Sequence, residues 1–360
     1  MSLNVLLPRP TASPSGPRIL PVTDDRTREA FLVCPQLLHP GARWGVRSRA
    51  EQIALLDPER NPFLLHGRVQ LYVAERDGVV VGRVAAVDDP LLNAAQGTRH
   101  GCFGLFECVD DPAVARELLG AVREWHRARG RRTLLGPMNF STNQECGMLL
   151  DAFAVPPALM MPYNPPYYPA LMDGCGLRKA KDLFAWEYAP AAPRSARVER
   201  LCAALERRGT VSFRSMGAEE LMQRAYAVRV LYNRIWQDNW GFAPATAAEF
   251  RELVRQVGPL LPGGAAVLAE SGGAPVGFML LLPNPGTTTG RVMAMGVLPE
   301  ARAQGAGVLL VRECFERARA LGMTSFEGSW TLEDDDAVNR IGAAFGGVRT
   351  KTYRIYTGAL

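Results

Sequence analysis

One segment in the second half of the chain has the residue types and spacing of a phosphate site. It follows the pattern V-x-P-x-x-R-x-x-G-x-G, with Arg302, Gly305 and Gly307 just before the apolar run 308–311. Glycines let the backbone approach a ligand closely, and a helix that begins there presents N–H groups without intrahelical acceptors. The segment therefore predicts an anion site made of backbone N–H groups. Neither a G-x-G-x-x-G fingerprint nor a Walker lysine is present in it.

The elements that must position this segment recur in both halves of the chain. The second half predicts a strand, a helix, a hairpin, a strand, a helix and a strand at 211–216, 218–236, 265–282, 291–297, 307–322 and 324–330. The first half predicts the same order at 18–22, 26–38, 70–87, 101–109, 112–130 and 131–140. Both halves are then expected to close with a short helix and terminal strands. We interpret the chain as a duplication of one α/β unit.

The domain boundaries follow from composition. Residues 1–17 are rich in Pro and Ser and predict a loose tail. The Ala- and Pro-rich stretch 189–197 favours a linker, which we place at 191–197. The first domain is then expected at 18–190 and the second at 198–360.

The loop pattern and its strand and helix context resemble the acyl-CoA loop of the GNAT acyltransferase superfamily, and other segments resemble bacterial two-domain GNAT-like proteins. The resemblance implies an α/β (α+β) fold class with two tandem GNAT-like domains, each a mixed, mostly antiparallel sheet flanked by helices. It implies acetyl-CoA or another acyl-CoA as co-substrate, with its pyrophosphate on the loop N–H groups. The residues implied to bind it are Val297, Arg302, Ala303, Gln304, Gly305, Ala306, Gly307 and Val308.

The first half departs from this pattern. Where the phosphate loop should lie, residues 106–119 contain no glycine, and Asp110 and Asp111 would repel a pyrophosphate. We expect this half, which is then a degenerate domain, to bind no acyl-CoA. Tandem GNAT proteins such as N-myristoyltransferase and the Fem peptidyltransferases likewise use one half to shape the acceptor groove.

Acyl transfer from a thioester to an amine needs a neutral nucleophile, a stabilised oxyanion and a proton for the thiolate. The resemblance implies a backbone N–H near Val297 as oxyanion donor. Glu327 and Glu333 are candidate bases, although Glu327 could be an ordinary strand carboxylate and Glu333 could belong to a helix cap. Many GNAT enzymes have a tyrosine acid where this chain has Gly342, so Tyr353 is a candidate in its place.

Two aromatic segments are candidates for binding the acceptor. Trp236 and Trp240 are four residues apart and share one helix face, which core packing would also explain. The segment 163–168 has two prolines and several aromatic side chains with polar tips, which suit a groove wall or a purely structural loop. Its candidate residues are Tyr163, Asn164 and Tyr167.

Composition excludes several classes of protein. The net charge is a modest +5, and the basic residues form no stripe, so we expect no nucleic-acid partner. The seven cysteines form no C-x-x-C pair and the four histidines have no ligand spacing, so no metal or disulfide framework is expected. No long apolar run and no secretory signal are present, so we expect no transmembrane segment and a cytoplasmic protein.

These observations predict an acyltransferase that moves an acetyl or longer acyl group from coenzyme A directly to a small-molecule or peptide amine. Two alternatives stay open. One is a tandem-GNAT enzyme with a long-chain acyl or aminoacyl donor. The other is a non-catalytic acyl-CoA-binding protein, which the glycine at position 342 would suit. The oligomeric state is not predicted.

Overall fold

The computed structural model describes residues 16–42 and 44–360, and each half of the chain forms strands flanked by helices. The first half contains β1 (Arg18–Pro21), α1 (Asp25–Leu38), α2 (Arg49–Leu56), β2 (Arg68–Arg76), β3 (Val79–Asp88), α3 (Pro90–Gln96), β4 (His100–Cys108), α4 (Pro112–Arg127), β5 (Thr133–Gly136), β6 (Met138–Asn139), β7 (Glu145–Cys146), β8 (Met148–Leu149), α5 (Tyr168–Gly174) and β9 (Arg178–Tyr188). The second half contains α6 (Ala196–Arg207), β10 (Ser212–Met216), α7 (Ala218–Gln223), α8 (Ala225–Trp236), α9 (Ala247–Val257), β11 (Ala265–Ser271), β12 (Ala274–Pro283), β13 (Thr289–Val297), α10 (Pro299–Arg302), α11 (Ala306–Ala320), β14 (Ser325–Leu332), α12 (Asp336–Ala344) and β15 (Val348–Ala359). Two short 3₁₀ helices, η1 (Pro62–Leu65) and η2 (Gly258–Gly263), complete the described elements.

The turns and caps expected from the sequence are present. Asp77 and Gly78 both have positive φ in the first hairpin, as do Gly272 and Gly273 in the second, and this is the backbone geometry of a tight hairpin turn. The α4 helix begins with Pro112. The side chain of Asp111, the residue before it, accepts a hydrogen bond from the N–H of Ala113. The two halves therefore have hairpin turns of similar backbone geometry.

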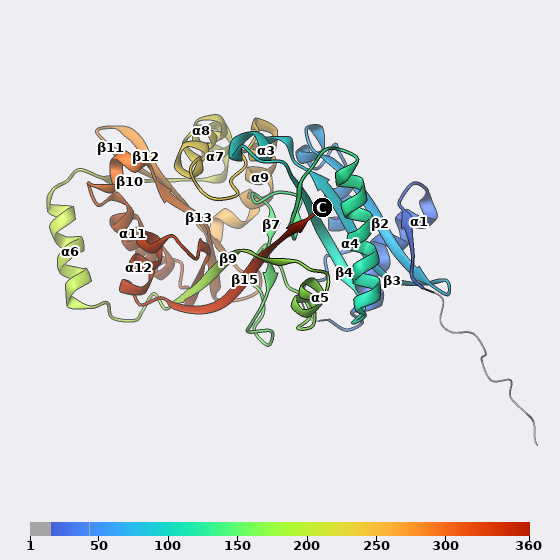
Figure 1. Ribbon diagram of the computed structural model, residues 1–360. Helices are drawn as coiled ribbons and strands as arrows, with labels where there is room; N and C mark the ends of the chain where they lie inside the picture. Colours follow the sequence, from blue (N-terminus) through green and yellow to red (C-terminus); the bar gives the residue numbers. More distant parts are fainter. Residues whose placement is uncertain (1–15, 43) are drawn as a thin grey trace, which may run out of the picture.

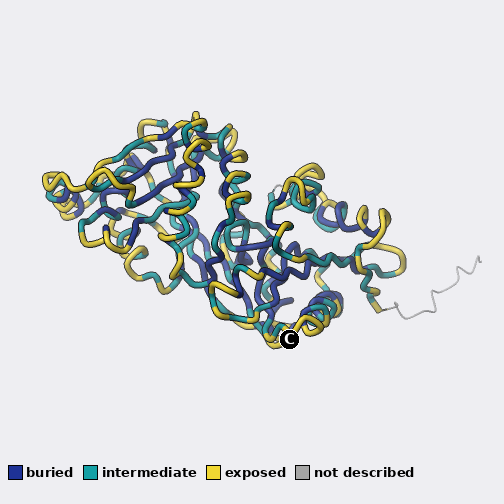
Figure 2. Tube along the Cα trace, turned by 90° about the horizontal axis from the view of Figure 1, so that it is seen from above, coloured by how far each residue is buried: buried dark blue, intermediate teal, exposed yellow. Residues whose placement is uncertain are grey.

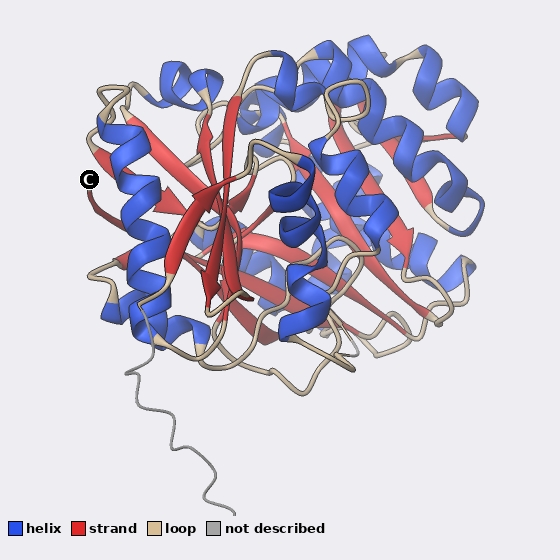
Figure 3. Ribbon diagram, turned by 90° about the vertical axis from the view of Figure 1, so that its right-hand side faces the viewer, coloured by secondary structure: helices blue, strands red, loops and turns tan. Residues whose placement is uncertain are grey.

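One sheet runs through both halves, in the order β1-β2-β3-β4-β5-β15-β9-β14-β13-β12-β11-β10, with β8 paired to β15. Most neighbouring strands are antiparallel, whereas β4–β5 and β13–β14 are parallel. The fold class predicted from the sequence is confirmed: the structure is a mixed, mostly antiparallel sheet with helices on its faces (Figure 3).

The two halves exchange their last strands. The β9 strand comes from the first half but pairs with β14, and β15 comes from the second half but pairs with β5. The two exchanged strands also pair with each other at the centre of the sheet, as the crossing of β9 and β15 in Figure 1 shows. The closing helix and terminal strand predicted for each half are present, as α5 and β9 in the first half and α12 and β15 in the second. The sequence did not predict that these strands would pair across the two halves. The boundaries 18–190, 191–197 and 198–360 remain a prediction, and residues 1–15 of the tail expected at 1–17 lie outside the described residues.

Helices cover both faces of the sheet in the second half. Alternate β12 residues face opposite sides: Met279 and Leu281 pack with α6 and α11, whereas Phe278 and Leu280 pack with α7, α8 and α9. Buried segments accordingly run through the interior of both halves, with exposed residues on the outer helices and turns (Figure 2). None of the helices within 16–42 and 44–360 is long and apolar enough to cross a membrane.

The parallel pair of the second half separates partway along its length. The β13 and β14 strands pair only over Thr289–Val292 and Ser325–Gly328. Beyond that point β13 stays with β12, and β14 stays with the exchanged strand β9. The edge of β13 from 293 to 297 is therefore left without a neighbouring strand on one side.

The strand exchange predicts that neither half folds alone. A fragment of residues 190–360 lacks β9, so the inner edge of β14 would lose its pairing, and a fragment of residues 16–189 lacks β15. We expect each fragment alone to show no cooperative thermal transition, and a co-expressed pair to regain one, as measured by circular dichroism. A cooperative transition in either fragment by itself would contradict this role of the exchanged strands.

Candidate functional site

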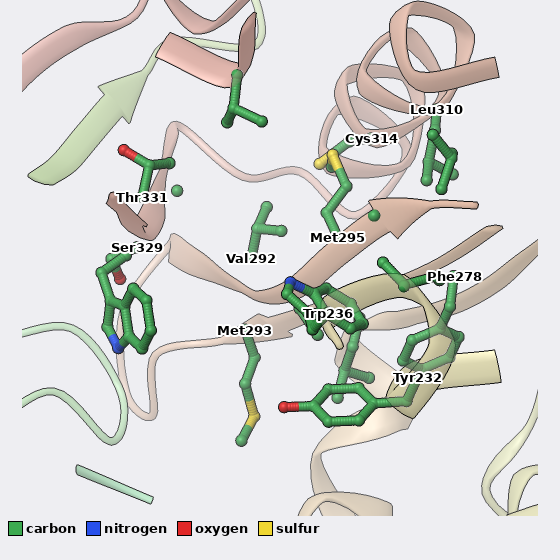
Figure 4. A pocket seen from close by; sticks show the side chains of 18 of the residues that line it. Tyr232, Trp236, Phe278, Val292, Met293, Met295, Leu310, Cys314, Ser329 and Thr331 are labelled. Carbon is green, nitrogen blue, oxygen red and sulfur yellow. The ribbon is translucent and has the colours of Figure 1, made fainter. Parts of the chain in front are cut away.

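A cavity of about 560 Å³ opens where β13 and β14 separate (Figure 4). Its volume lies within the range typical of small-molecule sites. It has three regions: a loop end at the start of α11, an apolar end beneath α8 and α9, and a polar end formed together with the first half.

The loop end has the geometry of an anion site. Gly305 precedes α11 with a φ of +79°, and the first intrahelical bond runs from Leu309 N–H to Gly305 O at 3.1 Å. The N–H groups of Ala306, Gly307 and Val308 thus lie ahead of the helical ladder, and among the described residues no side chain caps them. A Cβ on Gly305 would lie 2.5 Å from Leu205 Cδ2 of α6, so close packing also requires glycine there.

Most of the predicted loop residues come together in this region. Val297, Arg302, Gly305, Gly307 and Val308 line the cavity. The other three predicted loop residues do not line the cavity. Ala306 is fully buried, Gln304 Oε1 accepts a hydrogen bond from Ser271 Oγ at 3.0 Å, and Ala303 is exposed.

The free edge of β13 presents backbone N–H groups to the cavity. Leu298 N–H donates to Val276 O of the neighbouring chain segment at 2.8 Å. Because backbone groups alternate in direction along an antiparallel strand, Gly296 faces β12 in the same way, and the N–H groups of Met295 and Val297 face the opening. The edge that β14 has left therefore offers hydrogen-bond donors to a ligand.

The apolar end passes through the sheet to its other face. The cavity touches Val292, Leu310 and Phe326 on the α11 side, and also Phe278 and Leu280, which pack under α8 and α9. Further lining residues on that side are Leu221, Ile235, Phe250, Leu253, Val254 and Val257. The gap between the strands thus connects the loop end to an apolar chamber.

Both predicted tryptophans line the cavity. The ring of Trp236 lies between β13 and Tyr232, whose ring centroid is 4.5 Å away (Figure 4). A Cβ on Gly296 would lie 3.1 Å from Trp236 Cζ2, so this glycine allows α8 to approach β13. Trp236 consequently stands at the passage between the loop end and the chamber.

The first half contributes the polar end of the cavity. Thr142, Asn143 and Gln144 line it, and the second half fixes the first two. Thr142 Oγ1 donates to Gly241 O at 2.8 Å and Asn143 Nδ2 donates to Ala243 O at 2.7 Å. A ligand in the cavity would contact both halves.

A buried charge cluster lies beside the cavity and contains two of the predicted catalytic residues. Glu327 Oε2 accepts a hydrogen bond from Lys351 Nζ at 2.7 Å, and Glu327 Oε1 has no hydrogen-bond partner among the described residues. Tyr353 is fully buried, and burial followed by the Glu327 charge raises the pKa of its hydroxyl. Neither side chain lines the cavity. Arg291, which does, donates to Ser329 Oγ at 2.9 Å and to Leu159 O at 2.6 Å.

The structure places the second candidate base, Glu333, outside the cavity. Glu333 accepts hydrogen bonds from Lys179 Nζ at 2.6 Å and from the N–H of Asp182 at 3.1 Å. The acidic run does cap a helix, but through Asp335, whose side chain accepts from the N–H of Val338 at the start of α12. Asp335 also lines the cavity.

The segment 163–168 does not reach the cavity. Tyr163 donates its hydroxyl proton to Phe153 O at 3.0 Å, and Tyr167 donates to Cys108 O at 2.8 Å. Asn164 is buried and bonds to both backbone groups of Leu149. The geometry of these contacts suits the structural alternative for this loop, and the acceptor-binding role remains a prediction.

Several residues that line the cavity were not predicted from the sequence, namely Thr142, Asn143, Gln144, Tyr188, Arg291 and Asp335. Tyr188 belongs to the exchanged strand β9, so no spacing in the sequence links it to α11 or α12. The missing tyrosine at position 342 was the one available signal, because it left the place open for a side chain from elsewhere.

The corresponding gap in the first half is closed by the chain itself. The β4 and β5 strands pair only over His100–Cys102 and Thr133–Leu135. Beyond them Asn139 Oδ1 accepts a hydrogen bond from the N–H of Leu105 at 2.8 Å, and a Cβ on Gly104 would lie 1.9 Å from Met138 O. This packing is consistent with the expectation that the first half binds no acyl-CoA.

Comparisons with known proteins agree with this geometry. A family model described as an acetyltransferase (GNAT) domain matches residues 193–336. The protein named bacterial ceramide synthase from Caulobacter vibrioides (strain NA1000 / CB15N) is 30% identical over 377 aligned positions, which cover 95% of this chain and 97% of that protein. Protein YghO of Escherichia coli (strain K12) is 29% identical, with 91% of this chain and 92% of that protein covered. Among solved structures, a tandem GNAT protein from the clavulanic acid biosynthesis pathway has a TM-score of 0.60 at 17% identity and covers 95% of this chain and 98% of its own; it supports the fold alone.

The buried pair Glu327–Lys351 predicts a large stability effect. Replacing Lys351 with Met leaves a buried carboxylate without its partner, which we expect to lower the free energy of unfolding by about 3 kcal/mol. Lys179→Met is the matched control, because Lys179 forms the exposed pair with Glu333 and should cost less than about 1 kcal/mol. Urea unfolding of both variants measures the difference, and equal losses would show that burial does not set the strength of the pair.

Proposed function

This chain belongs to the GNAT superfamily, as a tandem-domain member, and from that premise we propose that it transfers a long-chain acyl group from coenzyme A to an amine. The observation that carries the proposal is the continuous cavity from the N-terminus of α11, through the gap in the sheet, to the apolar chamber under α8 and α9. An acetyl group would need only the gap, whereas a long acyl chain would fill the chamber and bury its apolar surface.

The loop end suits the phosphates of coenzyme A. The N–H groups of Ala306, Gly307 and Val308 would bind the pyrophosphate, and the helix dipole of α11 favours that charge. The exposed guanidinium of Arg302, at the rim of the cavity, adds a positive charge close to the same place. The residues present thus fit this donor.

The edge of β13 suits the reacting carbonyl. The N–H groups of Met295 and Val297 face the gap and would stabilise the oxyanion that forms when the amine attacks. One such donor is worth roughly 3 kcal/mol of transition-state stabilisation. Transfer is direct, because the cysteine that lines the cavity, Cys314, is buried and burial raises the pKa of its thiol.

The acceptor would enter at the polar end, which Thr142, Asn143 and Gln144 line and where Gln144 Oε1 has no hydrogen-bond partner among the described residues. The relative named bacterial ceramide synthase supports a lipid-like acceptor, since a ceramide is the amide of a long-chain acyl group with a long-chain amino alcohol. The apolar walls would favour the neutral amine, because burial lowers the pKa of an amine by up to several units. The base roles of Glu327 and Glu333 and the acid role of Tyr353 stay predictions.

The anion site is tested at Gly307. A Cβ there would lie 3.6 Å from Val297 Cγ2, an ordinary contact, so alanine fits. Gly307→Glu should weaken coenzyme A binding by about a hundredfold, because a carboxylate would oppose the phosphates. Gly307→Ala should stay within about threefold of the wild type. Isothermal titration calorimetry with coenzyme A measures both, and undiminished binding by the glutamate variant would overturn the site.

The chamber is tested at Val254 on α9. Val254→Phe adds bulk inside the chamber and should weaken the binding of a long-chain acyl-CoA by about tenfold or more while leaving that of acetyl-CoA unchanged. Acetyl-CoA serves as the internal control for folding and for the loop end. If the wild type bound both donors equally and the variant changed neither, the long-chain donor would be rejected and the acetyl donor kept.

A further inference from the structure

Tyr188 from the first half is built into the second half beside the cavity. It ends β9, and its ring stacks on Phe326 of β14 at 5.0 Å and meets Phe315 of α11 edge-on at 5.7 Å. Tyr188 and Phe326 are also register partners in the sheet. The strand exchange therefore places the Tyr188 ring between α11 and α12, against Phe315 and Gly342.

Three glycines make room for that ring. A Cβ on Gly342 would lie 2.7 Å from the Tyr188 hydroxyl oxygen, one on Gly347 would lie 2.5 Å from Cε1, and one on Gly328 would lie 3.1 Å from Cε2. Gly342 lies inside α12, where glycine is less favourable than alanine. Its presence is explained by the hydroxyl that occupies the neighbouring space.

The Tyr188 hydroxyl is available to a ligand. Tyr188 and Gly342 both line the cavity, and the hydroxyl makes no hydrogen bond with the described residues. Burial raises the pKa of Tyr188, and the titratable group facing it is Cys314 of α11, which is itself buried. The phenol is thus protonated at neutral pH. The other tyrosine in the cavity, Tyr232, has its hydroxyl engaged with Asn143 Oδ1 at 2.9 Å.

The position of Tyr188 matches the route of the donor. The proposed pyrophosphate site lies at the start of α11, and the carbonyl site lies at the edge of β13. The thiol arm between them would run through the part of the cavity that Cys314 of α11, Gly342 of α12 and Tyr188 line. Its sulfur is bonded to the carbonyl carbon and leaves as a thiolate, which is a poor leaving group unless a proton reaches it.

We propose that Tyr188 is the proton donor to the coenzyme A sulfur, supplied to the second half by the exchanged strand. This inference rests on the proposed function. The amine nitrogen bonds to the carbonyl carbon, the carbon–sulfur bond breaks with its electron pair on sulfur, and the Tyr188 O–H proton moves to that sulfur. The proton lost by the amine then restores the phenol, so no further reagent is consumed.

The test uses coenzyme A itself and needs no acceptor. A hydroxyl that donates to the sulfur lowers the pKa of the bound thiol, and we expect a drop of about one unit in the wild type, read from the ultraviolet absorbance of the thiolate during a pH titration. Tyr188→Phe should abolish the drop while keeping the affinity for coenzyme A within about threefold. Tyr232→Phe is the matched control, and it should leave the drop in place.

A second pair of variants separates loss of the Tyr188 hydroxyl from misfolding. Gly342→Ala should displace the hydroxyl and reduce the drop in thiol pKa, whereas adding Gly342→Ala to Tyr188→Phe should change nothing further, because the clash is gone. With an acceptor in hand, Tyr188→Phe should lower kcat by about a hundredfold with little change in KM.

The outcomes separate the two proposals. If the wild type binds no coenzyme A, the proposed function fails and Tyr188 loses its role with it. If the wild type binds coenzyme A and its thiol pKa is the same in the wild type and in Tyr188→Phe, the role of Tyr188 is overturned while the proposed function stands.

Discussion

The separation of β13 from β14 is the constraint on which the rest of the structure depends. Two parallel strands that paired along their whole length would leave no gap in the sheet and no free N–H groups on β13. The pairing stops at Val292 and Gly328 because β14 continues along the exchanged strand β9, with Ser329 opposite Ala185 and Leu332 opposite Leu183. A strand of the first half thereby forms part of the frame around the cavity of the second.

The buried charges tie the same strands together. Glu327 of β14 pairs with Lys351 of β15, and Arg291 of β13 donates to Ser329 Oγ and to the backbone oxygens of Ser329 and Leu159. Removing such charges from water is costly, and their attraction offsets that cost only in a fixed geometry. The cluster therefore favours one arrangement of the strands around the gap. The presence of Arg291 in the cavity wall means that the same geometry also defines one side of the binding space.

The sequence predicted the features that depend on local chemistry. The hairpin turns, the helix starts and the glycine loop with Arg302, Gly305 and Gly307 follow from neighbouring residues, and the structure shows them in the expected context. Contacts that depend on the topology of the sheet could not be predicted from the sequence. The exchange of β9 and β15 leaves no periodic signal, so Tyr188 could not be placed in the second half. Trp236 could be placed on a helix face, but whether that face meets core or cavity is decided by the sheet beneath it.

A parallel strand pair separates in both halves, but the resulting gap is closed in the first half and open in the second. In each half a parallel pair opens after three or four residue pairs, and each second strand is held by a strand from the other half. An opened strand edge carries unpaired backbone groups, which must find partners or remain solvated. In the first half the chain supplies the partner through Asn139, so that gap is closed. In the second half Trp236 and Gly296 hold α8 against β13, but the edge itself stays open toward the cavity. A duplicated unit that closes one gap and keeps the other open over an apolar chamber has the architecture expected of a protein with one donor site and a second half free to shape the acceptor.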